Sequence, residues 1–95
     1  MNCVFSEQAA NRLKVILGQQ EDKSLKVRIV VHADNYDAQY GLGLDVQRKN
    51  DELIMTNAGI EVLMEKKVKF LDNLEVDYNP TDDKWVITKR LQTTF

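Results

Sequence analysis

The clearest pattern in the sequence is an alternation of apolar and polar residues on both sides of a polar loop. Apolar side chains recur at every second position from Lys26 to His32 and again from Tyr40 to Val46. Alternation with a period of two over this length is typical of strands with one buried face. The polar loop from His32 to Ala38 joins the two predicted strands. Because loops held on rigid strands often carry function, this loop is the first candidate for a site.

The rest of the pattern predicts one N-terminal helix, one short helix and several short strands. The first helix begins after Ser6, whose hydroxyl can accept a hydrogen bond from a free amide of the first turn, and ends near Gly18. The short helix is expected over residues 65–71. Further strands are expected over residues 2–5, 53–56, 60–64, 74–78 and 85–87. Most connections are short, so we predict an α+β fold that is mostly β, with short mixed or antiparallel strands.

Composition narrows the class of protein. The 95 residues predict a single domain, 1–95, and the net charge of −2 argues against a nucleic-acid surface. No apolar run approaches the length of a membrane span, and the start, MNCVFSEQAANR, lacks the features of a signal peptide. The only cysteine, Cys3, has no partner for an internal disulfide. We therefore expect a cytoplasmic protein with no membrane and no nucleic-acid partner.

Four segments occur in the order found in a known family. SEQAANRLKVIL is similar to the opening helix of the HesB/IscA-like (A-type) iron–sulfur cluster biosynthesis family, and KVRIVV to the strand before its cluster-binding loop. YGLGLD resembles the strand that leaves that loop, and IEVLMEKKVKFLDNLEVDY resembles the strand, turn and strand that follow. The resemblance covers nearly all of the chain. It implies a HesB-like fold and a non-enzymatic role in iron–sulfur cluster biosynthesis.

The resemblance fails at the ligands. The family carries a cysteine in the loop before its YGL-like strand, and counting back from Tyr40 puts Asn35 at that position. The family also has a C-x-C-type pair near its C-terminus, whereas the corresponding KRLQTTF has no cysteine. Iron–sulfur clusters are held mainly by thiolates, and a neutral amide is a hard oxygen donor. The resemblance therefore implies an accessory or partner-binding protein without a cofactor. The expected partners are iron–sulfur assembly components, with a homodimer as a further expectation.

Cys3 has two interpretations. It can be a ligand between subunits, with each of two chains giving one sulfur. The alternative is a small apolar side chain, partly buried on an edge strand. The second interpretation is favoured, because cluster sites usually need several cysteines.

The polar loop has two interpretations as well. His32, Asp34 and Asp37 carry the ligand types of a mononuclear metal site. In the alternative, the Asp and Asn side chains of the loop, Asn35 included, accept hydrogen bonds from the local backbone. Tyr36 is the candidate for an exposed aromatic anchor in a protein contact.

Three functions remain open from the sequence. The first is the non-enzymatic accessory role described above, and the second is an interaction module unrelated to iron that uses the loop from His32 to Ala38. The third is a mononuclear metal binder at the same loop. We expect no catalysis, because the single histidine has no serine or cysteine partner at a recognisable spacing and no phosphate-loop or zinc-pair motif occurs.

Overall fold

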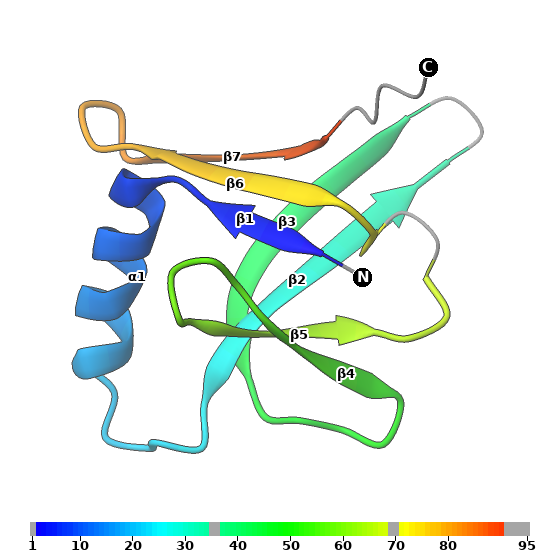
Figure 1. The fold of residues 1–95 in the computed structure, drawn as a ribbon, viewed down its shortest axis with the longest axis horizontal. Coiled ribbons are helices and arrows are strands. Elements are labelled where there is room, and N and C mark those ends of the chain that lie inside the picture. Colours follow the sequence, from blue (N-terminus) through cyan, green and yellow to red (C-terminus); the bar gives the residue numbers. More distant parts are fainter. Residues whose placement is uncertain (1, 35–36, 69–70, 91–95) are drawn as a thin grey trace.

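The computed structural model describes residues 2–34, 37–68 and 71–90. These residues form two β-sheets and one α-helix (Figure 1). In chain order the elements are β1 (Cys3–Phe5), α1 (Glu7–Gly18), β2 (Lys26–Ala33), β3 (Ala38–Asp45), β4 (Asp51–Met55), β5 (Glu61–Glu65), β6 (Leu74–Asn79) and β7 (Lys84–Lys89).

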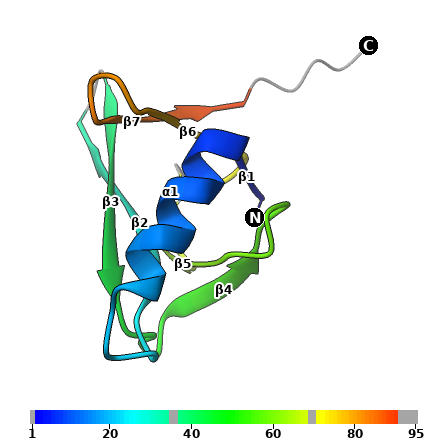
Figure 2. The ribbon, with the colours of Figure 1, turned by 90° about the vertical axis from the view of Figure 1, so that its left-hand side faces the viewer.

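The larger sheet, which we call sheet B, has the strand order β3-β2-β5-β4. Strands β2 and β3 form the predicted antiparallel hairpin, in which Val27 lies opposite Leu44 and Ala33 lies opposite Ala38. Strand β2 pairs in parallel with β5 at two positions, and β5 pairs with β4 in a second antiparallel hairpin. The sheet turns sharply between the two hairpins (Figure 2). Such a turn follows from the short pairing between β2 and β5, because two strands joined over few residues can twist freely.

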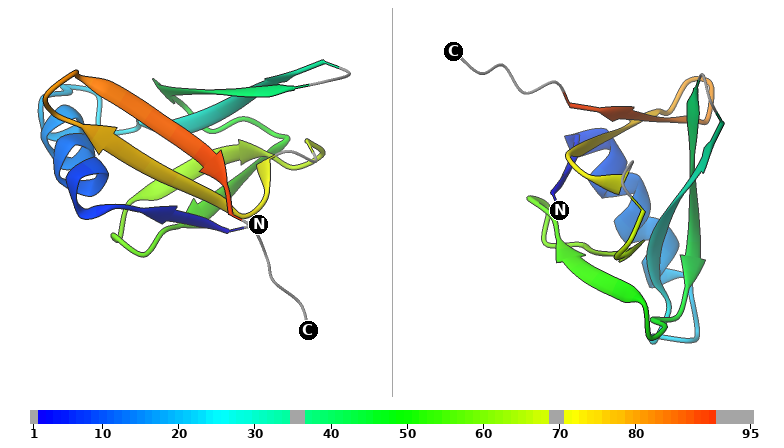
Figure 3. Two further views of the ribbon diagram at one scale, coloured as in Figure 1. Left: turned by 90° about the horizontal axis from the view of Figure 1, so that it is seen from above. Right: turned by 90° about the vertical axis from the view of Figure 1, so that its right-hand side faces the viewer.

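The smaller sheet, sheet A, has the order β1-β6-β7. Strand β1 runs parallel to β6, and β7 runs antiparallel to it. Seen from above, β6 and β7 lie over β4 and β5 (Figure 3). The prediction of a mostly β fold with mixed strands is confirmed by these two sheets.

Helix α1 closes one end of the space between the sheets (Figure 1). Its N-cap is Ser6, as predicted, and the Ser6 hydroxyl accepts a hydrogen bond from the amide of Ala9 at 3.1 Å. The helix buries Ala9, Ala10 and Leu13. Helix α1 has twelve residues. No helix in the described ranges is both long and apolar enough to cross a membrane.

The core lies between sheet A, sheet B and α1. Its buried residues come from every element except β3 and β7, whose apolar side chains pack against its margin. The alternation read from the sequence is confirmed in β2, where Val27 and Ile29 are buried, and in β6, where Leu74, Val76 and Tyr78 are buried. One face of each strand therefore supplies the core, which is the reason for the period of two.

The short helix expected over residues 65–71 is not formed as an α-helix. Glu65 is the last residue of β5 and pairs with Asp51, while Lys66 continues the hairpin by donating to the carbonyl of Asn50 at 2.9 Å. After it, Val68 donates to Glu65 and the Leu71 amide donates to the Val68 carbonyl, both at 3.3 Å and both three residues back. These are tight turns of the 3₁₀ type. Sheet pairing takes the start of the segment, and too few residues remain for an α-helix; residues 69 and 70 lie outside the described ranges.

A buried ion pair fixes the base of the β2–β3 hairpin. Nη1 of Arg28 donates to Oδ1 of Asp51 at 2.8 Å, Nη2 donates to Oδ2 of Asp51, and Nε donates to Oδ2 of Asp45 at 2.8 Å. The Arg48 amide also donates to Asp51, at 2.7 Å. The Asp51 side chain is 3% exposed. These hydrogen bonds hold the connection between β3 and β4 against β2.

Candidate functional site

The loop at the tip of the β2–β3 hairpin is shorter than the sequence predicts. His32 lies opposite Gln39, and Ala33 lies opposite Ala38. The two strands therefore stay paired into the segment expected to be loop, and only residues 34–37 connect them. The expected loop from His32 to Ala38 is wrong at both ends, because the backbone ladder continues past the point where the apolar alternation stops.

Within this short loop, the carboxylates bind the loop's own backbone. Oδ1 of Asp34 accepts from the Asp37 amide at 2.8 Å, and Oδ1 of Asp37 accepts from the Ala38 amide at 2.8 Å. The Asp34 amide in turn donates to the Asp37 carbonyl at 2.9 Å. This is the local bonding that favours aspartate in turns. The other two candidate residues, Asn35 and Tyr36, lie outside the described ranges.

The metal-site hypothesis for this loop is not supported. His32, Asp34 and Asp37 do line one shallow hollow at the hairpin tip. However, no three His, Cys, Asp or Glu side chains in the described ranges come close enough together to hold a metal ion. The physical reason is that both carboxylates are turned toward backbone amides of the loop. The three residues are thus neighbours in the fold but do not converge on one point.

Cys3 lies in the core and not on the surface. It sits on β1 opposite Leu74 and is 1% exposed. Burial raises the pKa of the Cys3 thiol to about 12. A thiol ligates iron as the thiolate, which this environment strongly disfavours. The structure therefore favours the apolar interpretation of Cys3, and its burial is deeper than the partial burial expected for an edge strand.

Tyr40 lies on the inner face of β3, as expected. It is partly buried and packs against the core beside Leu42. Burial raises the pKa of the Tyr40 hydroxyl. Tyr40 therefore packs against the core and is not an exposed anchor for a protein contact.

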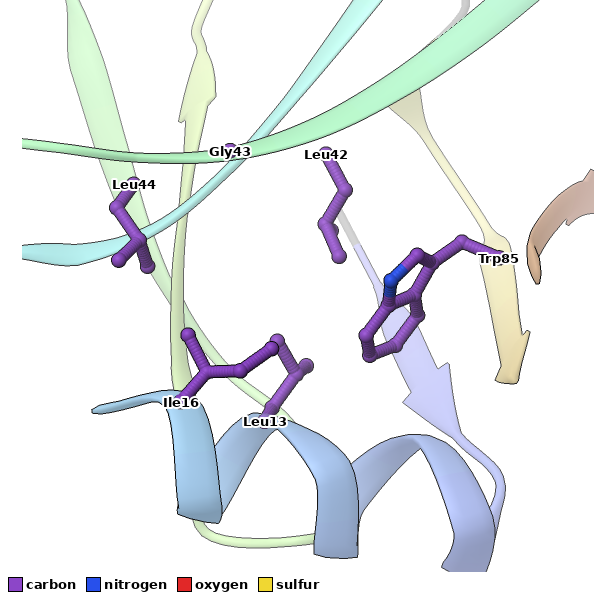
Figure 4. A pocket seen from close by; sticks show the side chains of 6 residues that line it. All are labelled: Leu13, Ile16, Leu42, Gly43, Leu44 and Trp85. Atoms are coloured by element: carbon purple, nitrogen blue, oxygen red, sulfur yellow. The ribbon is translucent and has the colours of Figure 1, made fainter. Parts of the chain in front are cut away.

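A small apolar hollow that the sequence did not indicate lies between α1, β3 and β7 (Figure 4). Its volume is about 120 Å³. It is lined by Leu13, Ile16, Leu42, Gly43, Leu44 and Trp85. The lining carries no ionisable group, so the hollow suits the binding of an apolar group and not acid–base chemistry. The alternation in β3 and the helical spacing in α1 indicated two apolar faces, but no local signal indicated that they face each other across a gap.

No family model matches the chain. The chain is 29% identical over 94 residues to the iron–sulfur cluster insertion protein ErpA 2 of Methylococcus capsulatus, covering 95% of this chain and 72% of the relative. It is 28% identical over 76 residues to the iron–sulfur cluster insertion protein ErpA of Histophilus somni, covering 78% and 67%. The structure resembles that of Escherichia coli SufA, a protein involved in the biosynthesis of iron–sulfur clusters, with a TM-score of 0.69 and 19% identity over 92% of this chain and 77% of SufA.

The fold is therefore that of a small HesB-like α+β protein, as the likeness to SufA shows. The sequence likeness to the two ErpA proteins and the structural likeness to SufA support the resemblance of this chain to the HesB/IscA-like family of A-type iron–sulfur cluster biosynthesis proteins. The resemblance read from the sequence is confirmed at this level. Both sequence relatives are named for the insertion of iron–sulfur clusters.

Proposed function

We propose that this chain is a non-enzymatic, accessory member of its family that acts by binding protein partners and does not hold a cluster through cysteine thiolates. The observation that supports the proposal is the state of its only cysteine. Cys3 is 1% exposed, and burial raises the pKa of its thiol to about 12. A buried, protonated thiol on a core strand is a poor ligand for iron.

The other donors of the chain do not replace the missing thiolates. The position that corresponds to the loop cysteine of the family is Asn35, by the gap-free count from Tyr40. Its neighbours Asp34 and Asp37 use one oxygen each to bind backbone amides of the loop. An iron–sulfur cluster, which for this family is cargo, needs soft anionic ligands, and carboxylates and amides are hard oxygen donors. The residues present therefore do not fit the cargo.

The partners follow from the family. The two sequence relatives described above are named iron–sulfur cluster insertion proteins. We propose that this chain binds components of the same assembly process in the cytoplasm, with self-association into a homodimer as a further expectation. A role of this kind needs only the scaffold and its surfaces.

Anaerobic reconstitution with ferrous iron and sulfide tests the loss of ligation. After desalting, we expect background iron and sulfide and no visible absorbance, both for the natural chain and for the Cys3→Ser variant. A cysteine-bearing member of the family, treated in parallel, is the positive control. A stable cluster on the natural chain would contradict the proposal, and one that survives Cys3→Ser would show that ligands other than cysteine suffice.

Affinity purification separates this proposal from an interaction module unrelated to iron. The accessory role predicts that the tagged chain recovers cluster-assembly proteins from its native host. Recovery of partners from unrelated processes alone, at matched expression and against a tag-only control, would instead favour the general interaction module.

A further inference from the structure

Strand β1 is an edge of sheet A that carries no charge of its own. In the described ranges it pairs with β6 alone, and its residues are Cys3, Val4 and Phe5. An edge strand presents unpaired backbone N–H and C=O groups, which proteins protect with charged side chains, short strands or a cover. The opposite edge strand of sheet A, β7, begins with Lys84 and ends with Lys89. Strand β1 is short but uncharged, so its protection depends on another part of the chain.

The backbone groups of Phe5 point away from β6. The Ser6 amide donates to the Val76 carbonyl of β6 at 2.9 Å, so Ser6 faces the neighbouring strand. Backbone groups along a strand point alternately to one side and to the other. The N–H and C=O groups of Phe5, and those of Cys3 two residues earlier, therefore face the unpaired side of β1.

The side chain of Asn57 covers this side at Phe5. Oδ1 of Asn57 accepts from the Phe5 amide at 2.7 Å, and Nδ2 donates to the Phe5 carbonyl at 3.1 Å. A residue of an added antiparallel strand would exchange the same two hydrogen bonds with Phe5. Asn57 belongs to the turn between β4 and β5, which lies beside β1 (Figure 1). One amide side chain thus takes the place of an added strand.

The turn that carries Asn57 is held by its own hydrogen bonds. The amide and the hydroxyl of Thr56 both donate to the Ile60 carbonyl, at 3.1 and 2.7 Å. The Gly59 amide donates to the Thr56 carbonyl at 3.1 Å, and Gly59 has a positive φ that favours glycine. The sequence of the turn therefore positions the Asn57 amide against β1.

Without this cover, the strand that fits the edge is β1 of a second copy of the chain. The two outward-facing residues, Cys3 and Phe5, lie symmetrically about Val4. In antiparallel pairing about a two-fold axis at Val4, Cys3 of each copy lies opposite Phe5 of the other, and each such pair exchanges two hydrogen bonds. This pairing satisfies the outward backbone groups of both residues, and no charged side chain of β1 opposes it.

We propose that Asn57 makes an autoinhibitory contact, which keeps the edge of β1 closed and prevents two copies of the chain from joining their sheets through β1. The contact lies within one chain, so it competes with pairing between chains at any concentration. A homodimer of the natural chain would therefore use another surface. The inference does not rest on the proposed function, because it concerns pairing of the chain with itself and not the choice of partner proteins.

Disulfide cross-linking at Val4 tests the proposal. In the two-fold pairing, Val4 of each copy faces Val4 of the other as a non-hydrogen-bonded pair, with Cα atoms about 4.5 Å apart. A disulfide spans Cα separations of about 4.4–6.8 Å. Val4→Cys is combined with Cys3→Ala, so that the introduced thiol is the only one. Formation of cross-linked dimer under a mild thiol oxidant is then compared with and without Asn57→Ala.

Two control variants separate protection of the edge from loss of stability. Asn57→Asp loses the donor to the Phe5 carbonyl but places a negative charge at the edge, which opposes strand pairing. Gly59→Ala strains the same turn and leaves the Asn57 amide in the chain. We expect Asn57→Ala to raise the initial rate of cross-linking at least tenfold and each control to change it less than twofold. Urea unfolding checks that every variant is folded.

Two results would overturn the proposal. The first is a cross-linking rate that is the same with and without Asn57→Ala. The second is cross-linking as fast in Asn57→Asp or Gly59→Ala as in Asn57→Ala, because loss of stability alone would then explain the dimer.

If Asn57→Ala does not fold, Asn57→Ser replaces it, because serine is too short to bond both backbone groups of Phe5. Amide hydrogen exchange of the natural chain gives a separate test. The Phe5 amide should be protected, and exchange at the rate of an unprotected amide would show that the cover is absent.

Discussion

Removing the charge of Asp51 should destabilise the protein and change how its stability depends on pH. The carboxylate accepts two hydrogen bonds from Arg28 and one from the Arg48 amide. The Arg28 guanidinium lowers the pKa of Asp51 from 3.8 to about 2. Each unit of pKa corresponds to about 1.4 kcal/mol, so the ion pair contributes at most about 2.5 kcal/mol to the free energy of unfolding. The Arg28 side chain is 13% exposed, so partial screening by solvent reduces the expected loss in Asp51→Asn to about 1–2 kcal/mol.

The pH dependence gives the prediction its sign. Because the pKa of Asp51 is lower in the folded state, its contribution is complete above about pH 4 and disappears as the pH falls toward 2. Urea unfolding, followed by Trp85 fluorescence at several pH values, should show the natural chain and Asp51→Asn converging in acid. Glu52→Gln removes a neighbouring exposed carboxylate as the control and should change stability by less than about 0.5 kcal/mol. A difference between the natural chain and Asp51→Asn that is absent at pH 7, or equally large at pH 3, would refute the reasoning.

Three further predictions concern single residues. The Cys3 thiol should react with a disulfide reagent only at the rate of unfolding, and rapid reaction in native buffer would contradict its burial. Asn57→Ala should cost about 1–2 kcal/mol in urea unfolding and increase aggregation by light scattering, since the edge of β1 loses its cover; unchanged values of both would argue against the edge-cap role. Gly59 has φ +73°, so Gly59→Ala should lower the free energy of unfolding by about 1 kcal/mol in thermal unfolding. A stabilised variant would exclude that backbone conformation.

Local pattern was sufficient for most elements. The β2 and β3 strands follow from an alternation of period two, and α1 follows from helical spacing after the N-cap at Ser6. Both periodicities arise within a few residues, so they are visible in the sequence. The segment 65–71 shows the limit of this reasoning, because pairing of Glu65 with Asp51 in β4 outweighed a local helical pattern.

The candidate site was predictable only in its composition. The sequence alone determined that there is a single cysteine. That Asn35 corresponds to the family's loop cysteine stays a prediction from the gap-free count back from Tyr40. It also indicated local bonding as one of two interpretations of Asp34 and Asp37, which the geometry favours. The number and kind of side chains that could act as ligands are fixed by the sequence, and folding does not change them.

Tertiary structure decided what those residues can do. It placed Cys3 in the core opposite Leu74, where burial keeps the thiol protonated. It also brought Ile16, Leu42 and Trp85, from three separate elements, around one hollow. Burial and convergence depend on which distant segments pack together. Such contacts depend on the whole fold. A hydrophobic periodicity of two or of 3.6 residues therefore does not predict them.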